Sequence, residues 1–157
     1  MSREELDELR AQVGRESQAL QAAVDSVDQA VAVVLGINRT DLRCLEVLWH
    51  GDSTPGELAA ELGLTSGSVT TMLDRLSKLD YVVRHPGSGD RRKVLIRITE
   101  IGLARIMQIY DPIVQEGSEE IARYTTAELR TVIDFLRCSR ELQERHRIRI
   151  AALSERA

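Results

Sequence analysis

Two helix boundaries lie close together in the segment TPGELAAELGLTS, and they limit how this chain can fold. Thr54 is followed by Pro55 and, three positions after Thr54, by Glu57, which is the pattern of a capping box with proline in the first helical turn. Gly63 supplies the left-handed residue that commonly ends a helix, and Thr65 is a suitable cap for the next helix. Two short helices joined by so tight a turn predict a helix-turn-helix.

The second helix of this pair, expected from Thr65 to Leu79, separates apolar from polar residues. Its apolar side chains recur at helical spacing and are predicted to face the core: Val69, Met72, Leu73, Leu76 and Leu79. The opposite face carries short hydroxyl side chains, which suit phosphates and close approach to a DNA groove, and an arginine that can reach a phosphate or a guanine edge. The candidate DNA-binding residues of this helix are Thr65, Ser66, Ser68, Thr70, Thr71 and Arg75.

A β-hairpin is expected directly after the helix-turn-helix. YVVR and KVLIRIT are rich in β-branched and aliphatic residues, as strands are, and HPGSGD between them has the glycines and proline of a turn. The end of the hairpin carries three consecutive cations, Arg91, Arg92 and Lys93. Residues 64–97 hold seven Lys or Arg and three Asp, so the net charge of this segment is +4. The formal net charge of the whole chain is −4, so the residues outside this segment together carry −8.

This distribution of charge predicts nucleic-acid binding. An α-helix fits the major groove of a duplex, and a ribbon that ends in arginine can reach a minor groove of strongly negative potential. Two other interpretations remain: a hairpin end that is charged only for solubility, and a winged helix used as a protein-interaction module, which would present an apolar or acidic face. No enzyme is expected, because the sequence has neither a glycine loop that could hold phosphate nor a nucleophile motif.

Long helices are predicted on both sides of this region. Apolar residues spaced by three and four, with one gap near Glu16, form one stripe on an N-terminal helix: Leu6, Leu9, Val13, Leu20, Val24, Val27, Val31 and Val34. Thr40 is expected to cap the helix that follows, and HGDS to end it. Thr99 is a capping candidate for a long helix after the hairpin, and a last helix is expected from about Thr126 to the end of the chain.

The composition indicates an ordinary folded domain. A chain of 157 residues suits a single folding unit. The first ten residues, MSREELDELR, are charged, whereas a signal peptide would be apolar. The longest mostly apolar run, residues 30–37, is too short to span a bilayer. We therefore expect a cytoplasmic protein without membrane contact. Cys44 and Cys138 match no zinc or redox spacing and are expected to be free thiols, and neither a metal nor a cofactor is expected.

The stretch TPGELAAELGLTSGSVTTMLDRLSKLDYVVRHPGSGDRRKVLIRITEIG resembles the multiple-antibiotic-resistance-regulator (MarR) family of winged helix-turn-helix transcription factors, with DRR, a strand and ITEIG as the wing signature. The resemblance implies that Arg92 enters the minor groove, that Asp90 braces it through an ion pair, and that Arg91 and Lys93 lie near phosphates. Asp80 departs from the family, which commonly has glycine there, but Asp tolerates a left-handed backbone better than most residues.

The resemblance also implies a homodimer whose N- and C-terminal helices interleave. The expected fold is therefore mainly α with a small β-hairpin wing: an N-terminal dimerisation helix over residues 1–37, a winged helix-turn-helix DNA-binding region over 38–99, and C-terminal dimerisation helices over 100–157. A two-fold pair of such lobes reads half-sites about one helical turn apart, so the expected partner is double-stranded DNA with a pseudo-palindromic operator.

The expected function is a dimeric transcriptional repressor that a small molecule releases from DNA. Because family members often respond to phenolic or other aromatic ligands, Arg43, Trp49 and His50 are candidates for an effector pocket between the lobes, although a tryptophan such as Trp49 is more often a core residue. The alternative is a thiol-redox-responsive regulator that uses Cys138, which has arginines nearby, or Cys44, which is expected to pack as a small apolar residue.

Overall fold

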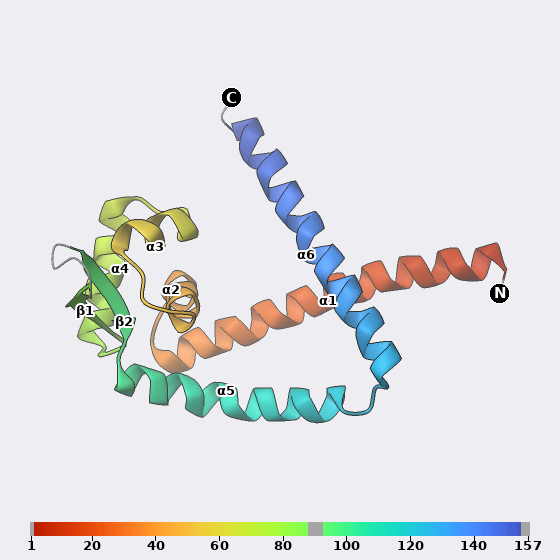
Figure 1. Ribbon diagram of the computed structural model, residues 1–157, viewed down its shortest axis with the longest axis horizontal. Coiled ribbons are helices and arrows are strands. Elements are labelled where there is room, and N and C mark those ends of the chain that lie inside the picture. Colours follow the sequence, from red (N-terminus) through yellow and green to blue (C-terminus); the bar gives the residue numbers. More distant parts are fainter. Residues whose placement is uncertain (1, 88–92, 155–157) are drawn as a thin grey trace. The chain divides into compact units, whose positions relative to one another are not determined.

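The computed structural model of the protein describes residues 2–87 and 93–154. In chain order it has α1 (Arg3–Leu35), α2 (Arg39–Trp49), α3 (Pro55–Leu62), α4 (Ser66–Lys78), β1 (Val82–Pro86), β2 (Val94–Ile98), α5 (Glu100–Ile121) and α6 (Thr126–Ser154) (Figure 1). The chain divides into two compact units, Met1–Tyr110 and Asp111–Ala157, so the division falls inside α5. The mainly α fold with a two-stranded hairpin confirms the predicted fold class.

The predicted helix-turn-helix is confirmed by its caps. The Thr54 hydroxyl accepts the Glu57 N–H, the Glu57 carboxylate accepts the Thr54 N–H, and Pro55 begins α3. Gly63 ends α3 with φ of 65°, in the left-handed region that glycine adopts without strain. Thr65 then caps α4 by accepting the Ser68 N–H. These bonds satisfy helix-terminal groups locally, which is why the sequence alone predicted them.

The prediction that Thr40 caps α2 is wrong, because Asn38 holds that position. The Asn38 side chain accepts the Asp41 N–H at 2.9 Å, and the Asp41 carboxylate accepts the Asn38 N–H at 3.2 Å. Three positions after Thr40 stands Arg43, which has no acceptor with which to complete such a box. Asn38 therefore forms the reciprocal pair, and Thr40 lies in the first turn of α2.

The hairpin has an antiparallel register that runs from Val82 opposite Ile98 to Pro86 opposite Val94. The sequence places His85 and Pro86 in the turn, and this is wrong, because both belong to β1. Proline is tolerated there because it is the last residue of an edge strand, and the next residue, Gly87, donates its N–H to the Lys93 carbonyl at 2.8 Å. Before β1, Asp80 has φ of 60°, so the turn does form with aspartate in the left-handed region.

The core of the first unit brings several elements together around the helix-turn-helix. Its buried apolar residues are Val31, Ala32, Leu35, Leu42, Cys44, Leu45, Leu48, Leu58, Val69, Met72, Leu73, Leu76, Tyr81, Val82, Ile96 and Ile106. The Tyr81 hydroxyl donates to the Leu35 carbonyl at 2.8 Å and ties the end of α1 to the start of the hairpin. In Figure 1, α2, α3 and α4 gather beside the hairpin, while the N-terminal part of α1 leads away from them.

The second unit contains the rest of α5 and all of α6. Thr125 caps α6: its hydroxyl accepts the Glu128 N–H, and the Glu128 carboxylate accepts the Thr125 N–H at 2.8 Å. None of the described side chains of α6 is buried. Among the described helices no single one has the length and apolar character of a membrane span; α1 and α2 meet that test only together, across a bend of 95°.

Candidate nucleic-acid interface

The outer face of α4 consists of short polar side chains. Ser66, Ser68, Thr70 and Thr71 are all exposed, as the helical pattern predicted. Their hydroxyls already make local bonds: Thr70 donates to the Ser66 carbonyl at 3.0 Å, Thr71 donates to the Gly67 carbonyl at 3.1 Å, and the Thr65 and Ser68 hydroxyls lie 2.9 Å apart. The two threonines therefore offer oxygen lone pairs and methyl groups outward, rather than the free donors that the sequence suggested.

Arg75 is held by a carboxylate inside the protein. Its Nε and Nη2 donate to the two oxygens of Asp41 at 2.8 and 2.5 Å, and the Asp41 side chain is fully buried while that of Arg75 is 41% exposed. The hydrogen bonds from Arg75 to Asp41 raise the pKa of the guanidinium above its usual value. Arg75 therefore fixes α4 against the start of α2, a role that the sequence did not indicate. Of the guanidinium nitrogens, Nη1 is the one that does not bond to Asp41.

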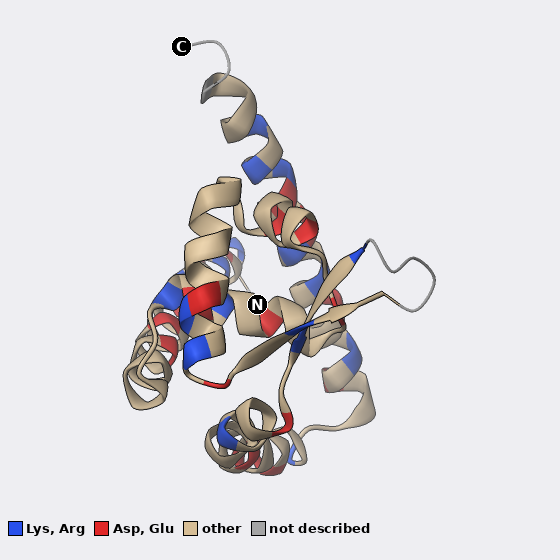
Figure 2. Cartoon of the chain, turned by 90° about the vertical axis from the view of Figure 1, so that its left-hand side faces the viewer, with Lys and Arg blue, Asp and Glu red and all other residues tan. Residues whose placement is uncertain are grey.

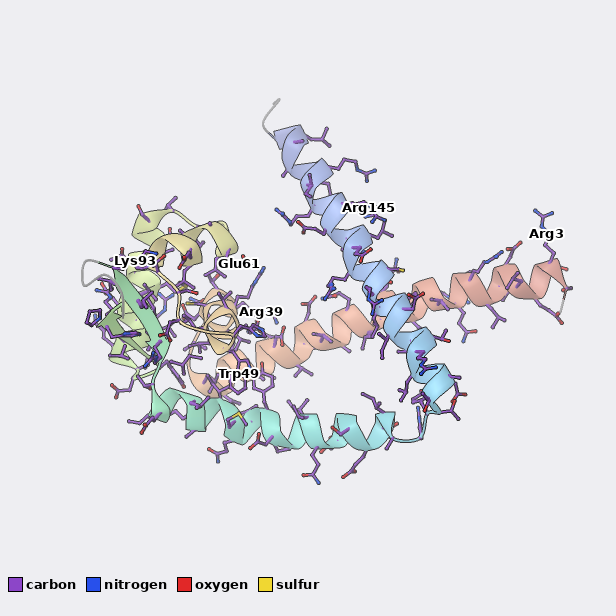
Figure 3. The ribbon with its side chains drawn as sticks, in the orientation of Figure 1. Arg3, Arg39, Trp49, Glu61, Lys93 and Arg145 are labelled. Carbon is purple, nitrogen blue, oxygen red and sulfur yellow. The ribbon has the colours of Figure 1, made fainter. Side chains whose placement is uncertain are left out.

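The wing carries positive charge on both strands. Neither β1 nor β2 contains an acidic residue, and Arg84 lies in β1 while Arg97 lies in β2. Figure 2 shows the Lys and Arg positions of the hairpin in blue. Arg84 forms an exposed ion pair with Asp74 of α4 at 2.7 Å. Lys93 is exposed at the end of the hairpin (Figure 3). The other predicted wing residues, Asp90, Arg91 and Arg92, lie outside the described residues.

The base of the wing contains a carboxylate that sequence reasoning missed. Asp52, in the loop between α2 and α3, accepts hydrogen bonds from Arg97 Nε at 2.9 Å and Nη2 at 2.6 Å, and it lies 3.0 Å from His85 Nε2. The hydrogen bond from Arg97 is the main reason why the pKa of Asp52 is below its usual value. The partners are 33 and 45 positions away in the sequence, so no local pattern could have indicated them.

The three predicted effector residues lie at the surface of α2 and just after it. Arg43, Trp49 and His50 are all exposed, and Trp49, at 48%, is not a core residue (Figure 3). Two surface hollows lie elsewhere, one at the start of α1 lined by Glu5 and Leu9 among others, and one on α6. The effector site therefore stays a prediction.

The two cysteines have different environments. Cys44 is fully buried, and burial together with the nearby Asp41 carboxylate raises the pKa of its thiol to about 12, so it is protonated at neutral pH and packs as a small apolar residue. Cys138 is exposed on α6. Both thiols are free, and of the two only Cys138 is accessible to an oxidant.

A short helix with a polar outer face, followed by a basic hairpin, is the arrangement of a winged helix-turn-helix DNA-binding protein. Comparison with known proteins gives the family. A family model described as MarR family matches residues 35–93, and over 144 residues the chain is 33% identical to the HTH-type transcriptional regulator YcgE of Bacillus subtilis, an alignment that covers 91% of this chain and 92% of that protein. The chain belongs to the MarR family.

Solved structures agree with this assignment. Wild-type MarR from E. coli in its apo form is 27% identical, with 80% of this chain and 95% of that chain covered and a TM-score of 0.57. RV1404 from Mycobacterium tuberculosis, 23% identical, shares the fold with a TM-score of 0.65 over 90% of this chain and 96% of its own. The protein is a DNA-binding regulator of transcription, and the named curated relative is itself a transcriptional regulator.

Proposed function

We propose that the protein is a homodimeric repressor that binds a pseudo-palindromic DNA operator and leaves it when a small aromatic ligand binds. The observation that carries this proposal is the exposed hydroxyl-rich face of α4 next to a hairpin whose described strands carry only positive formal charge. A neutral face lets the helix approach the base edges, and the basic hairpin supplies the attraction to phosphate.

Each element has a separate part in this complex. α4 enters the major groove with Ser66, Ser68, Thr70 and Thr71, whose outward oxygens can accept hydrogen bonds from base amino groups. Arg75 contributes mainly by holding α4 in place, with its Nη1 side directed to phosphate. The residues Asp90, Arg91, Arg92 and Lys93 form the wing contact, in which Arg92 enters the minor groove, a role that rests on the sequence motif alone.

Repression needs only occupancy of a promoter, since a dimer across the site blocks polymerase without an activating surface. Release requires a second site, and the exposed indole of Trp49 at the end of α2 offers a flat apolar surface for an aromatic ligand. Trp49 is the only tryptophan of the chain, so quenching of its fluorescence by candidate phenolic ligands tests this assignment. Unchanged fluorescence at ligand concentrations that release the DNA would exclude Trp49 from the effector site.

Salt dependence of operator binding tests the function. A duplex found by footprinting upstream of the protein's own gene should bind with an affinity that falls steeply as salt rises, because phosphate contacts release counterions. Arg92→Ala should lower the affinity at least about tenfold and reduce the salt slope by about one, while the protein remains folded. Arg10→Ala, on α1 and outside the basic segment 64–97, removes the same charge and should leave both quantities unchanged. Equal binding by Arg92→Ala and wild type at every salt concentration would reject the wing contact.

A further inference from the structure

One carboxylate contacts both strands at the base of the wing. The Asp52 side chain is 24% exposed, binds Arg97 of β2 through two hydrogen bonds, and lies within hydrogen-bond distance of His85 of β1. In the hairpin register Arg97 lies opposite Val83 and His85 opposite Leu95, so Arg97 and His85 are diagonal neighbours on one face of the two-stranded sheet. A single residue from outside the hairpin therefore holds both strands.

The backbone next to Asp52 fixes where this carboxylate lies. Ser53 pairs with Ile96 of β2: the Ser53 N–H donates to the Ile96 carbonyl at 3.2 Å, and the Ile96 N–H donates to the Ser53 carbonyl at 2.8 Å. Ile96 is fully buried, so this pairing is anchored in the core. The loop after α2 thus acts as a short third strand that presents Asp52 to the hairpin at a defined register.

The imidazole of His85 lies between two acceptors. Nε2 is 3.0 Å from the Asp52 carboxylate, and Nδ1 is 3.1 Å from the Pro86 carbonyl oxygen. Neither acceptor carries a proton, and a neutral imidazole has one N–H only, so it can satisfy one of the two contacts. Both hydrogen bonds form together only when the ring carries both protons.

Other charges lie around this cluster. Arg97 shares the Asp52 carboxylate with His85, Lys93 lies near Glu57 of α3 at the other end of β2, and Arg84, beside His85 in β1, is paired with Asp74 of α4. Of the described charged groups near the hairpin, Asp52 is thus the anion that contacts the imidazole.

We propose that Asp52 is a positioning residue for the DNA-binding wing: it holds β2 through Arg97 and β1 through His85, so that the wing keeps the geometry in which it contacts the operator. This inference rests on the proposed function, because it assumes that the wing contacts DNA. The exposed Arg97–Asp52 pair contributes little to folding by itself, as exposed ion pairs generally do, so the expected effect is on DNA binding rather than on stability.

Whether operator affinity falls or rises when the Asp52 charge is removed distinguishes a positioning role from simple electrostatics. Removing a negative charge from the DNA-binding lobe should strengthen attraction to phosphate, whereas loss of the carboxylate that holds the wing should weaken binding. Asp52→Asn is therefore expected to lower operator affinity about fivefold in the full-length protein. The matched control is Asp80→Asn, which removes one negative charge from the same lobe and keeps a residue that accepts the left-handed backbone. Its affinity should equal or exceed that of wild type.

A pair of variants supplies the second readout. His85→Ala should lower operator affinity in the wild-type background and should have little or no further effect in an Asp52→Asn background, because both changes remove the same contact between Asp52 and β1. If the two losses of affinity add in full, the imidazole acts independently of Asp52 and the proposal is overturned. Asp52→Asn binding as tightly as wild type also overturns it.

Two further measurements distinguish a loss of wing positioning from a loss of folding and from a failure of the proposed function. Urea unfolding of every variant should give midpoints close to that of wild type, and a large loss of stability in Asp52→Asn would reassign Asp52 to folding and overturn the positioning role. Wild-type protein that binds no duplex from its own promoter region would instead contradict the proposed function. The two failures are therefore distinguishable.

Discussion

At the level of single residues, the depth of burial decides how much stability is lost when one partner of an ion pair is removed. Arg75–Asp41 and Arg84–Asp74 both connect α4 to a neighbouring element with N–O distances of 2.5 and 2.7 Å, but Asp41 is fully buried while both partners of the second pair are about half exposed. Removing the cation from the first pair leaves a carboxylate that water cannot reach. Removing it from the second leaves Asp74 solvated.

We therefore expect Arg75→Ala to lower the free energy of unfolding by roughly 3 kcal/mol, because the Asp41 carboxylate stays buried without its partner. Arg84→Ala is the matched control and should cost no more than about 1 kcal/mol. Urea denaturation of both variants measures the difference. Equal losses for the two variants would show that the Asp41 carboxylate finds another partner or that water reaches it.

The residues found from sequence and those missed differ in the range of their contacts. Thr54 with Glu57, Gly63 and Thr65 act within a few positions, so their spacing alone predicted both helices of the helix-turn-helix. Asp41 and Arg75 are 34 positions apart, and Asp52 and Arg97 are 45 apart. Such pairs depend on how helices and strands pack, and single-sequence patterns carry no information about that packing.

At the scale of secondary-structure elements, the start of α5 is held close to the start of the hairpin. Thr99 caps α5 by accepting the Gly102 N–H at 2.9 Å, its N–H donates to the Tyr81 carbonyl at 3.0 Å, and its hydroxyl donates to the Asp80 carbonyl. A Cβ at Gly102 would lie 2.7 Å from the Tyr81 carbonyl oxygen and 2.9 Å from the Tyr81 Cα. This helix can approach the hairpin so closely only with glycine at that position.

Gly102→Ala should accordingly destabilise the protein by about 1 to 3 kcal/mol, the usual cost of forcing an extra carbon into a packed site. Gly67→Ala provides the control, since a Cβ there meets no atom within 4 Å and alanine favours the helix, so its stability should be unchanged or higher by up to about 1 kcal/mol. Thermal or urea unfolding measures both. A Gly102→Ala protein as stable as wild type would mean that Tyr81 and α5 can move apart without a loss of stability.

Element boundaries were predicted best where a cap or a glycine marks them. α3 and α4 begin and end as expected, but the N-terminus of α2 and the end of β1 do not. At α2 Thr40 was the expected cap, but Asn38 holds that position because Asp41, three residues after it, can complete the capping box and Arg43, three residues after Thr40, cannot. At β1 the proline suggested a turn, whereas an edge strand needs no N–H from its last residue.

At the scale of the whole molecule, the long helices expose apolar side chains that a chain of this size ordinarily covers. On α1 the exposed residues repeat at intervals of three, four and seven: Leu9, Val13, Leu20, Val24 and Val27. On α6 they include Ile133, Leu136, Ile148, Ile150 and Leu153. Apolar surface repeated along one helix face marks a protein interface, and the occupant we propose is a second copy of this chain.

A charge placed on this stripe tests the proposed dimer. Wild type should elute as a dimer of about 35 kDa, twice the 17.6 kDa of one chain, with a melting temperature that rises with protein concentration. Leu20→Glu should shift the protein toward a 17.6 kDa monomer, because the glutamate would be desolvated in the interface, while Leu20 at 61% exposure adds little to the fold of a single chain.

Gln18→Glu adds the same charge to α1 away from the stripe and should leave the dimer intact. Because one lobe contacts only one half-site, the Leu20→Glu monomer should also lose most of its operator affinity although its helix-turn-helix is unchanged. A wild-type monomer at all concentrations would contradict the dimer. If Leu20→Glu and Gln18→Glu behave alike, the α1 stripe is not the interface, and the apolar residues of α6 become the surface to test.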